Sequence, residues 1–400
     1  MVKIVSTMRK IAADFVHTVS GPTRSATVVV LDDQHVIREI APISQYDSAS
    51  VEYCPGHLMP GFVNAHCHLE LSFMKGQIPE RTGLIEFVQQ VVAIRDNFSA
   101  EEQEAAIVAA EEEMLQGGIV AVGDISNDTR SFFQKAKGQL RYHTFVEVFD
   151  LGPAMTEASK KTGQDVLDAI PHVPGHTASL TPHAPYSCTP ELFRWISAYN
   201  QERGLLGMSI HNQEQPDENQ LFLDKTGDWL QFIKHMQLDY SWFVPSGKSS
   251  LQTYLDYLHP AQGWLFIHNT FTTTEDIAAA HKAGQQVYWG FCPNANLYIE
   301  DRLPDYVKFL QAGAQCVVGT DSLASNHQLS IWSELQTIRQ HAPDIPFTTL
   351  LPWATLNGAA CLGFQDTLGS LEVGKQPGLI WVPAKESDPL LSTVAPHRLA

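Results

Sequence analysis

Two histidines stand two residues apart in the stretch PGFVNAHCHLELS, where His66 and His68 close a short apolar run. Residues two apart on a β-strand point to the same face, so both imidazoles can reach one metal ion. The chain holds 17 histidines in 400 residues, and a pair with this spacing can therefore arise by chance. The pair predicts a metal site only if other parts of the chain supply the missing ligands.

Ligating or ionisable residues also follow several later apolar runs. These residues are His183, His211, Glu214, His268 and Asp321. Adding His211 and Asp321 to the first pair gives three imidazole nitrogens and one carboxylate oxygen, a set that suits zinc or iron and needs no thiolate. We therefore predict one divalent metal ion, with zinc as the first choice and iron as the alternative, held by His66, His68, His211 and Asp321.

The same residue types suit hydrolysis. A divalent metal lowers the pKa of a bound water toward neutrality and makes hydroxide available at physiological pH. Glu214, three residues past a predicted ligand, can take the water proton and pass it to the substrate. His268 can hold the hydroxide and stabilise the developing charge. Asp321 can carry a second proton as well as bind the metal.

Short buried strands and amphipathic helices must position these residues. Eight near-continuous apolar runs, from GFVNAH to QCVVGTD, lie between residues 60 and 362, and helical patterns separate most of them. This alternation predicts an α/β fold, a (β/α)8 TIM-type barrel over residues 58–362, with its chemistry at the carboxyl ends of the strands. A doubly wound open sheet is the alternative, but its first strand would lead into a glycine-rich phosphate turn, where His-Cys-His stands instead.

Strand-like runs broken by turn residues occupy both ends of the chain, residues 1–57 and 363–400. The last segment returns to strand-like runs separated by Gly and Pro, and we expect it to pack with residues 1–57. The prediction is one small β-sandwich domain made from both chain ends.

The composition is that of an ordinary globular protein, with 44% hydrophobic and 18% charged residues. The formal net charge of −18 should repel nucleic acid and anionic membranes. No stretch of 18 apolar residues is present, which predicts no transmembrane helix. The six cysteines are scattered, which favours a reducing cytoplasm over a disulfide framework.

In its motifs the chain resembles the amidohydrolase superfamily, in particular the mononuclear aminohydrolases, which include cytosine, guanine, S-adenosylhomocysteine and aminodeoxyfutalosine deaminases and chlorohydrolases. The motifs are PGFVNAHCHLELS, TPHAPYSCTPEL, HNQE, IHNT, GTDSLASN and LGSLEVGKQPG, in the family's order from residue 60 to 378. The resemblance implies the same metal ligands, a proton shuttle at Glu214, a water contact at His268 and a substrate contact at His183. The fourth strand carries no lysine at its rim, which implies one metal rather than two.

Two positions depart from the family's pattern. Ala295 stands after strand seven where the family often has serine, and Leu379 stands after the KxPG motif where an acidic residue is common. The first departure touches the pocket and bears on substrate choice. The second lies in the β domain and should affect packing alone.

The predicted substrate contacts are residues near the ligands that could hydrogen-bond to a ring or stack on it: His183, Glu70, Ser72, Tyr186 and Trp289. Phe291 could stack in the same way, although aromatic residues beside a strand more often belong to the core.

Three further features of the sequence have structural interpretations. Arg141 and Glu147 flank the third strand and could face either side, and Asn326 is expected to shape the loop after Asp321. The run from Glu111 to Glu113 predicts a solvated helix face.

Together these features predict a metal-dependent hydrolytic deaminase of a heterocyclic amine, such as a purine-like base or nucleoside, in which metal-bound hydroxide attacks the amine-bearing carbon and ammonia leaves. One alternative is hydrolysis of an amide or carbon–chlorine bond at the same site. A non-catalytic metal-binding barrel is disfavoured because no ligand or proton carrier is missing. A small heterocyclic molecule is the expected partner, and a homodimer is expected by analogy with the family.

Overall fold

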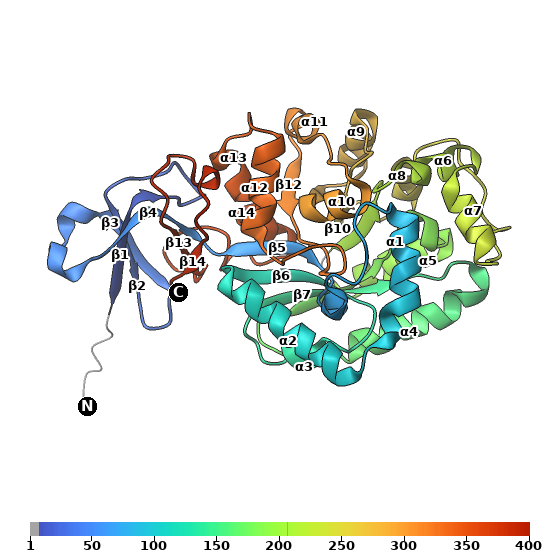
Figure 1. Ribbon diagram of the computed structural model, residues 1–400, viewed down its shortest axis with the longest axis horizontal. Helices are drawn as coiled ribbons and strands as arrows, with labels where there is room; N and C mark the ends of the chain where they lie inside the picture. Colours follow the sequence, from blue (N-terminus) through green and yellow to red (C-terminus); the bar gives the residue numbers. More distant parts are fainter. Residues whose placement is uncertain (1–7, 206) are drawn as a thin grey trace.

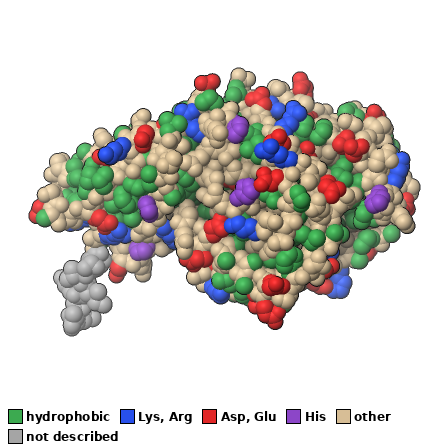
Figure 2. Space-filling model, in the orientation of Figure 1, with side chains coloured by type: hydrophobic (Ala, Val, Ile, Leu, Met, Phe, Trp, Pro, Cys, Tyr) green, Lys and Arg blue, Asp and Glu red, His purple; other side chains and the backbone are tan. Residues whose placement is uncertain are grey.

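The computed structural model describes residues 8–205 and 207–400. A small sheet lies at one end of the molecule, and a larger body of strands and helices forms the rest (Figure 1). No helix in the described ranges is both long and apolar enough to cross a membrane. Figure 2 shows acidic, basic and apolar side chains interspersed over one face of the molecule.

The small sheet draws its strands from both chain ends. Its strands are β1 (Arg9–Val16), β2 (Thr27–Leu31), β3 (Ile37–Pro42), β4 (Glu52–Pro60), β13 (Leu379–Val382) and β14 (His397–Arg398). They pair in the order β14-β13-β4-β1-β2-β3, so among the described residues they form one sheet rather than the two sheets of a sandwich. The predicted boundary at residue 57 falls inside β4, which continues to Pro60 before the next strand begins.

Within the described part of the chain, eight parallel strands form the larger body, each at one of the predicted apolar runs. One four-stranded sheet contains β5 (Phe62–Cys67), β6 (Ile119–Ser126), β7 (Arg141–Val148) and β8 (Thr177–Pro182). The other contains β9 (Met208–Asn212), β10 (Gly263–His268), β11 (Gln286–Phe291) and β12 (Gln315–Val318). The runs are buried on both faces because helices cover the outside and side chains fill the inside.

Backbone hydrogen bonds join the two half-barrels at both seams. At the β8–β9 seam, the amide nitrogen of His211 donates to the carbonyl of His183 at 3.0 Å. At the β12–β5 seam, the amides of Thr320 and Asp321 donate to the carbonyl of His66 at 3.0 and 3.1 Å. The predicted TIM-type barrel is confirmed, and its two seams lie at predicted metal ligands.

Helices fill the connections between the strands, and local caps begin several of them. The helices are α1 (Leu84–Ile94), α2 (Ala100–Gln116), α3 (Phe132–Lys135), α4 (Thr156–Asp168), α5 (Pro190–Glu202), α6 (Pro216–Asp224), α7 (Asp228–His235), α8 (Ser250–Tyr254), α9 (Thr274–Ala283), α10 (Pro293–Glu300), α11 (Tyr306–Gln311), α12 (Ile331–His341), α13 (Phe347–Trp353) and α14 (Leu356–Cys361). Reciprocal capping boxes at Ser99 with Glu102 and at Thr273 with Asp276 satisfy the free amides that begin α2 and α9.

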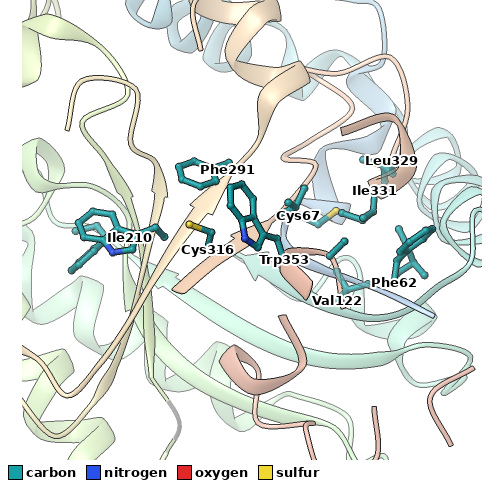
Figure 3. Close-up of a cluster of buried hydrophobic side chains, with 14 of the residues drawn as sticks. Phe62, Cys67, Val122, Ile210, Phe291, Cys316, Leu329, Ile331 and Trp353 are labelled. Carbon is teal, nitrogen blue, oxygen red and sulfur yellow. The ribbon is translucent and has the colours of Figure 1, made fainter. Parts of the chain in front are cut away.

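Alternate residues of the barrel strands face inward or outward. On β10, Leu265 and Ile267 pack into the barrel interior, whereas Trp264 and Phe266 pack against the helices outside. The outer layer forms the large apolar core, part of which is drawn in Figure 3.

Trp289 lies in this outer core, which corrects its predicted role. Its side chain is fully buried, with its ring 5.2 Å from those of Phe266 and Phe309, and its Nε1 bonds Nε2 of His281 at 3.2 Å. Phe291 packs in the same layer against Tyr306 and Phe309. The strand register turns both rings away from the barrel mouth, so neither is placed to stack on a substrate.

The acidic run on α2 is only partly solvated. Glu111 is fully buried, and its carboxylate accepts hydrogen bonds from Tyr142 at 2.7 Å and from Gln134. Glu113 is half-buried and accepts from the amide of Leu329 at 2.8 Å. Only Glu112 is exposed, because the helix presents one side of this run to β7 and α3.

Candidate metal and active site

Four predicted ligands converge at the carboxyl ends of strands from both half-barrels. Nε2 of His68 lies 3.2 Å from Nε2 of both His66 and His211, and 3.3 Å from Oδ1 of Asp321. One ligand atom from each of the four residues lies within 4.8 Å of the others, and all four residues are buried.

The chemistry of this donor set fits a divalent cation. Nδ1 of His211 donates to the carbonyl of His183 at 2.8 Å, so in the neutral ring the lone pair of Nε2 faces the cluster. Burial lowers the pKa of His211 to about 3 and that of His68 well below its ordinary value, which keeps both rings neutral. A proton on Nε2 of His68 could form a hydrogen bond with only one of its two neighbours, His66 or His211. A cation could instead accept one lone pair from each of the three rings.

Asp321 supplies the negative charge of the set. Burial by itself would raise the pKa of this carboxyl, but hydrogen bonding with His66 and electrostatic interaction with the polar ring of His68 lower it well below its usual range. Ser325 fixes the carboxylate by donating to Oδ2 at 2.6 Å, which leaves Oδ1 toward the histidines. The backbone at Asp321 has φ of 58°, a strained conformation for a residue other than glycine.

Glu214 and His268 lie side by side near the four ligands. Their Oε2 and Nε2 atoms are 3.6 Å apart, and both side chains are almost fully buried. Burial, followed by the charge of Asp321, raises the pKa of Glu214 well above its ordinary value, and burial lowers that of His268 to about 4. Glu214 can therefore hold a proton at neutral pH while His268 stays neutral.

A buried polar network holds the backbone before Glu214. Gln213 has a φ of 46°, its amide donates to Oε1 of Glu218 at 3.0 Å, and its side chain donates to Asp276 at 2.9 Å. These bonds stabilise a turn that the backbone alone disfavours, and the turn sets the direction of the Glu214 side chain.

Two predicted substrate contacts lie beside the ligands. The rings of His183 and His211 have centroids 5.0 Å apart, and Nδ1 of His183 bonds the hydroxyl of Ser187 at 2.7 Å. Tyr186 is buried and stacks on Trp229, with centroids 4.0 Å apart. His183 itself is half-buried.

The other two predicted contacts are tied into local structure. Glu70 is buried, accepts a hydrogen bond from the amide of Asn127 at 3.0 Å, and has its pKa raised to about 8 by burial. The hydroxyl of Ser72 donates to the carbonyl of Leu69 at 2.7 Å, so it stabilises the turn after His68.

Three further side chains surround the cluster without having been assigned a role from the sequence. Glu147, the next-to-last residue of β7, has its Oε1 3.5 Å from Nδ1 of His211. Asp124 accepts from the amide of Leu69 at 2.8 Å and pairs with the buried ammonium of Lys135 at 2.5 Å. The signal that could have found Glu147 and Asp124 is their position near the carboxyl ends of barrel strands.

Asn326 has the structural role predicted for it. Its side-chain amide donates to the carbonyl of Thr320 at 2.9 Å and to Glu334 at 2.8 Å, which holds the loop that follows Asp321.

Residues 57–396 match the amidohydrolase family. The chain is 27% identical over 379 residues to the 5-methylthioadenosine/S-adenosylhomocysteine deaminase of Teredinibacter turnerae, covering 88% of this chain and 78% of that one. The Helicobacter pylori aminofutalosine deaminase in complex with methylthio-coformycin superposes with a TM-score of 0.80 at 22% identity, over 98% of this chain and 100% of its own. An adenosine deaminase of Xanthomonas campestris with bound zinc superposes with a TM-score of 0.76 at 22% identity, over 94% of this chain and 84% of its own. These two structures share the fold of this chain.

Proposed function

The chain belongs to the amidohydrolase family, and on that basis we propose that it is a zinc-dependent hydrolase that removes the amino group from a purine-type ring, as a free base or as a nucleoside. The observation that carries the proposal is the buried convergence of three imidazoles and one carboxylate next to Glu214 and His268. A site with this donor set and a proton carrier is equipped for hydrolysis.

The relatives support the choice of bond and of metal. The Teredinibacter turnerae protein is named a deaminase of two adenosine derivatives, and the Helicobacter pylori enzyme is complexed with methylthio-coformycin. The Xanthomonas campestris enzyme carries zinc. We extend deamination of an adenosine-like ring and zinc as the metal to this chain. A homodimer, expected from the sequence by analogy, stays a prediction.

The proposed reaction breaks the carbon–nitrogen bond of the ring amine and forms a carbon–oxygen bond with water. His66, His68, His211 and Asp321 would hold the metal, which when bound supplies the Lewis acidity that ionises water near neutral pH. Glu214 takes a proton from water and delivers it to a ring nitrogen. His268 hydrogen-bonds to the attacking oxygen and stabilises its charge. Ammonia then leaves with the second water proton.

The surroundings of the cluster suit an aromatic substrate. We propose that His183 contacts the ring, that Tyr186 and Trp229 form an aromatic wall of the pocket, and that Glu70 accepts a hydrogen bond from the substrate. The hydroxyl of Ser72 donates its proton to the carbonyl of Leu69 within its own turn, so that proton does not serve the substrate.

The test is ammonia release from zinc-loaded protein incubated with adenosine, its 5′-thio derivatives, adenine, guanine and cytosine. We expect turnover of at least one adenosine-type compound and a loss of about 10²–10⁴-fold in kcat for Glu214→Gln, with zinc content unchanged. Glu112→Gln, an exposed change on α2, is the matched control and should behave as the parent protein.

Two results would contradict the proposal. Parent-like turnover by Glu214→Gln would remove the proton-carrier role. Release of chloride from a chlorinated triazine, without ammonia release from any amine, would assign the site to carbon–chlorine hydrolysis.

A further inference from the structure

Glu147 lies behind one of the metal ligands, on the opposite side of its ring from the metal cluster. We propose that Glu147 is a positioning residue that acts through His211 to strengthen metal binding. This inference rests on the proposed metal function, but it concerns the carboxylate behind the ligand rather than the reaction.

The contact joins β7 to β9. Oε1 of Glu147 is 3.5 Å from Nδ1 of His211, the ring nitrogen that faces away from the other ligands. The Glu147 side chain is 4% exposed and that of His211 is 11% exposed. Water therefore screens this approach very little, and the interaction is stronger than a surface pair at the same distance.

The two carboxylate oxygens of Glu147 differ in their hydrogen bonding. Oε2 accepts a hydrogen bond from the side-chain amide of Asn127 at 2.9 Å. Oε1 is buried and has no hydrogen-bond partner. A buried carboxylate oxygen without a donor is costly, and burial raises the pKa of Glu147. A positive charge on the other side of the His211 ring would favour the ionised form of Glu147.

A cation held by His211 together with His66, His68 and Asp321 would supply that charge. A metal bound at Nε2 makes the Nδ1–H more positive, and the adjacent carboxylate then stabilises the bound state of the ring. Conversely, the carboxylate raises the basicity of the ring nitrogen that binds the metal. Metal binding and the Glu147 charge should therefore reinforce each other.

A second metal ion between these residues is a weaker explanation. Glu147, His183 and His211 do bring one ligand atom each within 4.8 Å of the others. However, Nδ1 of His211 donates its proton to the carbonyl of His183 at 2.8 Å, and its Nε2 faces the first cluster. No lone pair of this neutral ring is left for another ion.

Asn127 sets the position of the carboxylate. Its side chain holds Oε2 of Glu147, while its backbone amide donates to Oε2 of Glu70 at 3.0 Å. The segment after β6 thereby links the turn after β5 to the end of β7, and it turns the free oxygen of Glu147 toward His211.

The test compares zinc affinities of the full chain by competition with a chromophoric chelator. Glu147→Gln keeps the shape of the side chain and removes its charge, and we expect zinc to bind about 10–100-fold more weakly. Asn127→Ala leaves the charge but releases its orientation, and we expect a smaller loss in the same direction. Glu111→Gln changes another buried, hydrogen-bonded carboxylate and should leave zinc affinity unchanged.

A spectroscopic measurement separates positioning from a general loss of structure. In the cobalt-substituted protein, the visible absorption bands should shift in Glu147→Gln and stay as in the parent in Glu111→Gln. Equal zinc affinity of Glu147→Gln and the parent would overturn the inference and leave the proposed function intact. Failure of the parent itself to bind zinc would instead overturn the metal-dependent function.

Discussion

Buried imidazoles in this protein differ in the hydrogen-bond partners of their two ring nitrogens. His143 has hydroxyl partners on both sides, Thr177 at 2.8 Å and Ser179 at 3.0 Å. His68 and His211 instead direct ring nitrogens at each other across 3.2 Å. The first arrangement is complete by itself and is structural. The second is complete only with a cation between the rings.

The His143 arrangement predicts a pH-dependent contribution to stability. Burial, followed by the charge of Lys135, lowers the pKa of His143 to about 3 from 6.5. Between these values the unfolded chain binds a proton that the folded protein excludes, so stability falls as pH drops below 6.5. The loss from this residue should reach on the order of 2 kcal/mol at pH 5, at about 1.4 kcal/mol per unit.

The variant His143→Gln removes this titration. It should be less stable than the parent at pH 7.5, because the hydrogen bonds of the His143 ring are lost. The difference in free energy of unfolding between the two proteins should be about 2 kcal/mol smaller at pH 5. Urea unfolding of both proteins at the two pH values measures this difference. A stability difference that stays constant between the two pH values would show that folding does not lower the pKa of His143.

At the scale of elements, the β12–β5 seam determines where His66 stands. Gly319 directly follows β12 and touches the backbone of His66. A Cβ added at Gly319 would lie 2.8 Å from both the Cβ and the carbonyl oxygen of His66. Real contacts are not this short, so any larger residue must push the two strands apart and move a predicted ligand.

We therefore expect Gly319→Ala to weaken zinc binding by tenfold or more and to cost about 1–3 kcal/mol of stability. Gly263→Ala is the matched control, because its nearest neighbour would lie at an ordinary 3.5 Å. Chelator competition and urea unfolding measure the two effects. Unchanged zinc affinity in Gly319→Ala would show that the seam yields without moving His66.

Over the whole molecule, the candidate metal site connects two half-barrels. His66 and His68 come from β5 and the turn after it, whereas His211 lies on β9 and Asp321 follows β12. A cation bound by all four would therefore hold both seams closed in addition to the backbone hydrogen bonds there. A metal ion that binds the folded state and not the unfolded state stabilises the folded protein by mass action.

Removal of the metal should lower the melting temperature of the protein. At free zinc 1,000-fold above the dissociation constant, the stabilisation should be about 4 kcal/mol. Calorimetry before and after chelation measures it, and hydrogen exchange should rise first at the amides of His211 and Asp321. His68→Ala should not respond to chelation; a response equal to the parent's would mean that the metal sits elsewhere.

Much of the architecture and of the candidate site could be predicted from local sequence. Buried parallel strands need continuous apolar runs, and capping residues such as Ser99 and Thr273 mark helix starts, so both features are written in neighbouring residues. The candidate metal ligands could also be predicted from the sequence, because they follow the ends of apolar runs and because His66 and His68 share one face of a strand. These properties depend on spacing within a few residues.

The tertiary structure decided which side of an element faces which neighbour. Trp289 belongs to the outer core, Glu111 is buried against Tyr142, and Glu147 stands behind His211, although their local sequences allow either face. The physical reason is strand register: a shift of one residue exchanges the two faces of a strand, and only partners distant in the chain fix that register. Long-range pairing likewise joins strands from both chain ends into one sheet.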